Sequence, residues 1–199
     1  MKEKEYMRLE SDSIGTMEVP EDAYYGVQAL RAKENFPITG TKLHPVFIKN
    51  LAKIKRAAAI TNRKAGRLKP EIANAIEASA NEVICGMFDK DFIVDGIQGG
   101  AGTSANMNMN EVIANRAIEM LCGKKGDYTI VHPNDHVNMA QSTNDVIPTA
   151  GKLTVLDLLK PLDKSLSLLT DALYDKAAAF DHIVKIGRTQ LEDAVPMRL

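Results

Sequence analysis

Three short segments hold the side chains best suited to binding or chemistry: residues 99–106, 141–145 and 187–193. They share neutral hydrogen-bond donors, chiefly Thr, Ser, Asn and Gln, placed beside glycines or where a helix is expected to begin. Such donors can stabilise negative charge when they are aimed at it before the charge develops. The composition of these segments therefore favours recognition of a small anion, with a carboxylate as the best candidate.

The first segment is a glycine-rich turn that opens a helix, Gly-Gly-Ala-Gly-Thr-Ser-Ala-Asn. Glycine lets backbone N–H groups approach an anion, the helix N-terminus adds partial positive charge, and Thr103, Ser104 and Asn106 add neutral donors. The segment matches neither GxGxxG nor GxxxxGK[ST], and no strand pattern precedes it. Nucleotide binding is therefore disfavoured. An ordinary loop without a ligand is the alternative.

The other two segments each have a structural explanation beside the functional one. In the second, Ser142, Thr143 and Asn144 suit capping of a helix and reception of a ligand equally well. In the third, Thr189 and Gln190 could simply belong to a surface connection with a solvated charge cluster. Neither segment is decisive alone.

The histidines and cysteines give little support for a metal centre or a disulfide. His132 and His136 lie four residues apart beside Asp135, but no third ligand is found at a suitable spacing. Cys85 and Cys122 lack CxxC spacing and fit reduced thiols. We therefore expect no metal and no other cofactor.

Charge and hydropathy exclude several classes of partner. The 199 residues include 25 basic and 26 acidic side chains, for a net charge of -1, without a basic stripe interleaved with aromatics. No stretch approaches eighteen uninterrupted apolar residues, and residues 1–20 lack the apolar core of a signal peptide. We expect a cytoplasmic protein that binds neither nucleic acid nor membrane.

The elements that must position these segments are mostly helical. Residues 1–45 contain frequent Gly and Pro and predict irregular structure, with a short helix at 22–32. Apolar residues at helical spacing then predict helices at 46–65, 70–86 and 104–121. The sequence therefore predicts a mainly all-α fold.

A leucine seam dominates the last sixty residues. Spacings of three and four residues predict a long helix that packs against other helices and bends at Pro161. Pro196 resembles the first residue of a further helix, only three residues before the sequence stops, so we expect a truncated chain. The seam consists of Leu156, Leu159, Leu162, Leu166, Leu169 and Leu173.

Taken together, the segments resemble the aspartase/fumarase superfamily over residues 8–199. The resemblance implies a mostly helical, three-domain homotetramer whose active sites each draw on three subunits. Residues 1–140 would form the N-terminal lyase domain, and residues 141–199 would begin the central helical bundle. Six blocks match in family order: residues 8–15, 24–28, 99–110, 132–135, 141–145 and 187–196.

The chemistry implied by the resemblance is elimination from a succinyl-type substrate to give fumarate. A proton is removed next to one carboxylate, and the resulting aci-carboxylate needs preorganised donors. Thr103, Ser142 and Thr143 would hold this carboxylate. Asn144, with Thr103 and Gln190, would lie near the leaving group, and Thr189 would help hold the other carboxylate. The expected substrate-binding residues are Thr103, Ser104, Ser142, Thr143, Asn144, Thr189 and Gln190.

Two further expectations follow from the resemblance. A block similar to His132, Asn134 and Asp135 is associated in fumarases with a second dicarboxylate site. The base serine of the family lies in a G-S-S-x-M-P-x-K-x-N signature toward the C-terminus, which is absent from residues 1–199. We therefore assign no catalytic base here and expect this chain to be inactive alone.

Within the superfamily, the residues resemble the aspartase branch more than the others. Gly-Ala-Gly-Thr, Gln-Ser-Thr-Asn and Gln190 have aspartase forms, whereas class II fumarases tend toward G-S-G-T and Q-S-S-N. The expected reaction is reversible deamination of L-aspartate to fumarate and ammonia. The alternatives are a class II fumarate hydratase and a non-catalytic helical interaction module.

Overall fold

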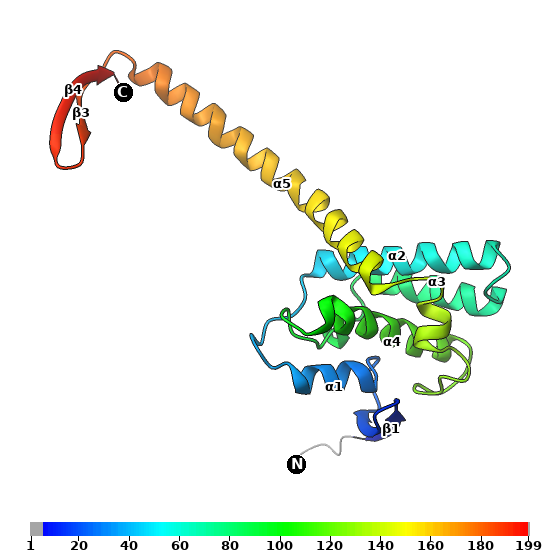
Figure 1. Ribbon diagram of the computed structural model, residues 1–199. Coiled ribbons are helices and arrows are strands. Elements are labelled where there is room, and N and C mark those ends of the chain that lie inside the picture. The colour runs from blue at the N-terminus through cyan, green and yellow to red at the C-terminus, as the bar shows by residue number, and fades with distance from the viewer. Residues whose placement is uncertain (1–5, 199) are drawn as a thin grey trace. The chain divides into compact units, whose positions relative to one another are not determined.

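The computed structural model describes residues 6–198 and is mainly helical, as the sequence predicted (Figure 1). Residues 1–5, part of the stretch in which no signal peptide was expected, lie outside the described residues. Within the described part, no helix is both long and apolar enough to cross a bilayer. In chain order the elements are β1 (Met7–Ser11), β2 (Thr16–Pro20), α1 (Val27–Asn35), α2 (Pro45–Lys64), α3 (Pro70–Ile84), η1 (Asp89–Asp91), η2 (Gly100–Gly102), α4 (Thr103–Met120), η3 (Pro133–Val137), α5 (Thr143–Phe180), β3 (Val184–Thr189) and β4 (Glu192–Arg198).

The chain divides after Thr154 into two compact units. The first contains all elements up to η3 together with the first turns of α5. The second contains the rest of α5 and the β3–β4 hairpin. The leucines of the seam lie in the second unit and are all exposed there, from 46% for Leu159 to 62% for Leu173.

Helix α4 forms the centre of the first unit. Its apolar side chains pack with α2 and α3 into one core, and Val112, Ile113 and Ile118 are fully buried. Because α4 is covered on nearly all sides, its polar residues are buried as well and need internal partners. Asn108, for example, donates from Nδ2 to the Asp91 carbonyl over 2.9 Å.

The three helices predicted from periodicity are confirmed, with every end within two residues of the expected position. Gly66 and Gly86 follow α2 and α3 with φ of +67° and +83°, the left-handed conformation common at helix ends. The seam helix α5 begins at Thr143, ahead of Pro148, and continues through Pro161. The bend at Pro161 stays a prediction.

The expectation of irregular structure before residue 45 was wrong in part. Strands β1 and β2 pair antiparallel, with Met7 opposite Pro20 and Ser11 opposite Thr16. Their turn is closed by Asp12, whose Oδ1 accepts the backbone N–H groups of Ile14 and Gly15 over 2.9 and 3.0 Å. The partner strand and an Asx-type turn supply the order that the composition of this stretch did not reveal.

Helix α1 begins at Val27, five residues after the predicted start, because two distant carboxylates fix its N-terminus. Glu111 of α4 accepts the backbone N–H groups of Gly26, Gln28 and Ala29 over 2.8 to 3.0 Å. Glu10 of β1 accepts that of Val27 over 3.0 Å. All four donors that open the helix are therefore satisfied from outside it.

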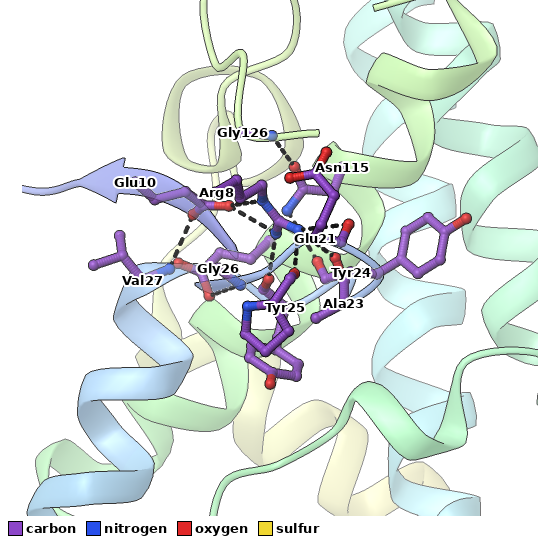
Figure 2. Close-up of polar contacts among 12 residues, drawn as sticks. Arg8, Glu10, Glu21, Ala23, Tyr24, Tyr25, Gly26, Val27, Asn115 and Gly126 are labelled. Atoms are coloured by element: carbon purple, nitrogen blue, oxygen red, sulfur yellow. Dashed lines mark hydrogen bonds and ion pairs between the residues drawn. The ribbon is translucent and has the colours of Figure 1, made fainter. Parts of the chain in front are cut away.

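Arg8 of β1 forms hydrogen bonds with the segment that precedes α1 (Figure 2). Its Nε donates to Glu10 Oε1 over 2.8 Å, and its guanidinium also donates to the carbonyls of Pro20, Glu21, Ala23 and Tyr25. This buried ion pair joins the N-terminal hairpin to the segment that leads into α1. Only glycine fits at position 26 of this segment, because a Cβ there would lie 2.4 Å from Tyr128 Oη and 2.6 Å from Glu10 Oε2.

The predicted helix at Pro196 was wrong. Pro196 lies in β4, where it pairs with Ile186 of β3. A proline lacks an N–H, so it is tolerated at the first residue of a helix and equally on an edge strand of a two-stranded sheet. The sequence cue was therefore compatible with both structures, and pairing with β3 decided between them.

Candidate functional site

The first two polar segments come together where α4 and α5 begin. Gly102 packs against the first turns of α5 so closely that a Cβ on it would lie 2.8 Å from Ile147 Cγ2. Asn106 of α4 donates from Nδ2 to Thr143 Oγ1 over 3.2 Å. Two helix N-termini, each with partial positive charge, thus lie side by side with neutral donors between them.

The glycine-rich segment forms a turn directly before α4, as its composition predicted. Gly100, Ala101 and Gly102 all have positive φ, of 70°, 49° and 90°. Thr103 is exposed, and its hydroxyl donates to the Gly100 carbonyl over 2.6 Å, so it closes the turn. Ser104, at the next position of α4, is half-buried.

Residues that precede the glycine-rich turn in sequence fix its position through hydrogen bonds. Gln98 Oε1 accepts the Ala105 N–H over 2.6 Å, and Gln98 Nε2 donates to the Asp95 carbonyl over 2.9 Å. Asp95 accepts four hydrogen bonds, among them the hydroxyl of Thr39. These bonds hold the pKa of Asp95 well below its usual value, with the Thr39 hydroxyl as the largest cause. The turn is therefore anchored through Gln98 to the backbone of Asp95, a residue whose carboxylate is itself held by four donors.

The second segment separates into a capping residue and ligand-facing candidates. Ser142 Oγ accepts the Asn144 N–H over 3.3 Å, which is the N-cap arrangement for α5. Thr143 is half-buried and makes no such bond; its Oγ1 accepts from Asn106. The Asn144 side chain is exposed. The capping explanation thus holds for Ser142, while Thr143 has a different partner.

Lys55 and Asn138 also form hydrogen bonds beside the two helix N-termini, and neither residue was predicted from the sequence. Lys55 of α2 is fully buried, and its Nζ donates to Asn138 Oδ1 over 2.8 Å. Asn138 Oδ1 also accepts from Asn106 Nδ2 over 3.2 Å. Lys55 lies at helical spacing between the buried residues Leu51 and Ala59, so a lysine on an apolar stripe was the available signal.

Burial lowers the pKa of Lys55 to about 7. The ordinary value of 10.5 describes the unfolded chain, so the folded state binds fewer protons between pH 7 and 10.5. The free energy of unfolding should therefore rise with pH across this window, and Lys55→Met should remove that rise. Urea denaturation at pH 6, 8 and 10 measures it, with Lys49→Met, an exposed lysine of the same helix, as the control. An unchanged pH slope in Lys55→Met would contradict the prediction.

The histidine segment forms a local turn. His132 Nδ1 accepts the N–H groups of Asn134 and Asp135 over 3.2 Å each, and the His132 N–H donates to His136 Nδ1 over 2.8 Å. Asn134 and Asp135 are exposed. Among residues 6–198, no group of three His, Cys, Asp or Glu side chains is arranged to hold a metal. Cys85 and Cys122 are free thiols, as expected.

The third segment lies in the second unit. Thr189 ends β3, and the two-residue turn to β4 begins at Gln190, which has a φ of 50°. Leu191 completes the turn and is 99% exposed. The turn therefore presents Thr189 and Gln190 at the end of a hairpin.

A family model and curated relatives both relate this chain to lyases. The lyase family matches residues 15–199. Aspartate ammonia-lyase of Bacillus subtilis is 52% identical over 197 residues, and fumarate hydratase class II of Halobacterium salinarum is 54% identical over 193. These alignments cover 99% and 96% of this chain, and the chain spans 41% of the length of each relative.

Among solved structures, a fumarate lyase:delta crystallin from Brucella melitensis in native form superposes with a TM-score of 0.90 at 48% identity. The match covers 98% of this chain and 46% of that one. The resemblance to the aspartase/fumarase superfamily is thereby confirmed. Because the family match extends over nearly the whole length, this chain belongs to the lyase family.

Proposed function

We propose that this chain serves as the N-terminal part of an ammonia-lyase that converts L-aspartate reversibly to fumarate and ammonia. One observation carries the proposal: the glycine-rich turn and the Gln141–Asp145 segment meet at two adjoining helix N-termini, through the 3.2 Å contact between Asn106 and Thr143. The substrate has two carboxylates, and an uncharged cluster of hydrogen-bond donors suits their recognition.

The reaction explains why these donors are neutral and preorganised. Removing a proton next to a carboxylate gives an aci-carboxylate with two negative charges on one group. Donors aimed at that group act mainly in the transition state and can each contribute about 2.7–4 kcal/mol. Thr103, Ser104, Ser142 and Thr143 are the donors we assign to it. The Thr103 hydroxyl, which closes the glycine turn through its bond to the Gly100 carbonyl, would turn to the ligand.

The remaining residues of the proposed site have separate tasks. We assign Asn144, with Thr103 and Gln190, to the departing amine, and Thr189 to the second carboxylate. We infer that different subunits of a homotetramer supply these groups, with residues 1–140 as the lyase domain and 141–199 as the start of the bundle. The exposed leucine seam supports this assembly, because it offers an apolar face for further helices.

A peripheral dicarboxylate site at His132, Asn134 and Asp135 forms a further part of the proposal. Since His132 Nδ1 accepts backbone N–H groups, the proton of the neutral ring sits on Nε2. That N–H is the group available to a carboxylate. The catalytic base and the cationic clamp would come from sequence outside residues 1–199. The two free thiols support a cytoplasmic setting.

An exchange of segments tests the proposal. Residues 1–199 replace the matching segment of Bacillus subtilis aspartate ammonia-lyase, giving an exchange enzyme, and in parallel the matching segment of the Halobacterium salinarum fumarate hydratase. We expect the first to form fumarate from L-aspartate and the second to lose most of its activity on malate. The reverse result would establish the fumarate hydratase alternative, which the 54% identity to that relative favours. Folded tetramers without turnover in either frame would support an interaction module.

A further inference from the structure

We propose that Asn106 is a positioning residue that sets the direction in which the Thr143 hydroxyl donates. It does so as the third member of a hydrogen-bond relay that runs from Lys55 through Asn138 to Asn106 and ends at Thr143. The inference rests on the proposed function in one respect: Thr143 is the residue whose proton would meet the substrate carboxylate.

The relay begins at a group that donates in either protonation state. Lys55 is completely buried, and its Nζ lies 2.8 Å from Asn138 Oδ1. The ammonium can only donate, which places the oxygen of Asn138 toward Lys55. A neutral amine can also accept, so for that form the second bond of Asn138 decides the orientation. A second bond agrees, because Asn138 Nδ2 donates to the Gln141 carbonyl over 3.2 Å. The orientation of the Asn138 amide is thereby fixed from both ends.

The fixed oxygen of Asn138 determines the next amide. Asn138 Oδ1 lies 3.2 Å from the side-chain amide of Asn106, which must therefore present its NH₂ group. The same nitrogen lies 3.2 Å from Thr143 Oγ1. Both hydrogens of Asn106 Nδ2 are used, one on each neighbour. Thr143 Oγ1 accepts this bond, so its single proton remains free to point at another acceptor.

The opposite end of the Asn106 amide shows that its neighbours impose this orientation. Asn106 is 2% exposed, and its Oδ1 is buried with no hydrogen-bond partner in the described chain. A buried carbonyl oxygen without a donor is unfavourable. The amide nevertheless keeps this direction, because the reverse one would set its oxygen against Asn138 Oδ1.

Two substitutions separate a directing role from simple packing. Asn106→Asp places a carboxylate, which only accepts, against Thr143; the hydroxyl should then turn its proton inward and away from the substrate. Asn106→Leu removes the contact without reversing it and leaves the hydroxyl free to rotate. If Asn106 directs the proton, the aspartate variant must lose more kcat than the leucine variant. A purely structural role predicts equal losses, or a larger loss for leucine.

The test is a double-mutant cycle in the exchange enzyme. Asn106→Asp alone should lower kcat about a hundredfold, the loss typical of one oxyanion-hole donor. In the Thr143→Val background the same change should lower kcat no more than about threefold, because the hydroxyl that it misdirects is absent. Independent, multiplying losses would overturn the relay.

Neutron diffraction on crystals of the unmodified 199-residue chain tests the relay without turnover or variants. We expect two deuterons on Asn106 Nδ2, one toward Asn138 and one toward Thr143, and the Thr143 deuteron directed elsewhere. A Thr143 deuteron pointing at Asn106 would refute the relay even in an active exchange enzyme. The expected deuterons in a chain whose exchange enzyme is inactive would instead retain the relay and reject the proposed function.

Discussion

Replacing Thr143 by valine in the exchange enzyme is expected to lower kcat for fumarate formation from L-aspartate about a hundredfold or more, with the fold intact. A hydroxyl that stabilises the aci-carboxylate should contribute about 2.7–4 kcal/mol to the transition state. A hydroxyl that only caps a helix would instead cost about 1 kcal/mol of stability. Ser142, not Thr143, accepts the capping bond of α5, so the structure favours the first outcome.

Steady-state absorbance at about 240 nm follows fumarate, and circular dichroism in parallel reports the fold. Two variants serve as controls. Thr143→Ser keeps the hydroxyl and should stay within a few-fold of the parent rate. Ser142→Ala is the control for stability: it should lower stability by about 1 kcal/mol, as expected for an N-cap, and it should lower kcat as well, because Ser142 is also assigned to the aci-carboxylate. An unchanged kcat with a lowered Tm in Thr143→Val would withdraw Thr143 from the site.

Replacing Glu111 by alanine is expected to cause the largest loss of stability. The side chain is fully buried and accepts three backbone N–H groups, from Gly26, Gln28 and Ala29. Each backbone N–H group left without an acceptor costs about 1–3 kcal/mol, so the three together should lower the free energy of unfolding by at least about 3 kcal/mol. A domain of this size has only about 5–15 kcal/mol in all, so much of the first unit's stability would be lost.

Urea denaturation measures this loss, with Glu71→Ala, an exposed glutamate of α3, as the control. The effect should depend on pH, because burial raises the pKa of Glu111 to about 7 from its ordinary 4.5. A raised folded-state pKa means that the stability Glu111 contributes is greatest below pH 4.5 and falls as pH rises toward 7. The loss in Glu111→Ala should therefore be smaller at pH 7.5 than at pH 4.5. A loss below about 1 kcal/mol at both would contradict the network.

The candidate site could be found from the sequence in its donors but not in their arrangement. The glycines and the runs of Thr, Ser and Asn identified residues 99–106 and 141–145, because each run has a local signature. Their meeting depends on Gly102 against Ile147, 45 positions along the chain, and no local pattern encodes that contact. Asn138 was missed for the same reason. Lys55 had a local signal, its place on an apolar stripe, but its partner appears only once α2, α4 and the loop before α5 are packed together.

By itself, the sequence determined the helices and the chemical character of the candidate site. Apolar residues at helical spacing, with Pro70 at one start and Gly66 at one end, are local signals that survive packing. The tertiary structure alone decided where α1 begins, because Glu10 and Glu111 lie 17 and 82 to 85 residues from the donors they cap. It likewise decided that Pro196 pairs in a strand. Strand pairing and buried hydrogen bonds join residues distant in sequence, so their partners are settled only when the chain is folded.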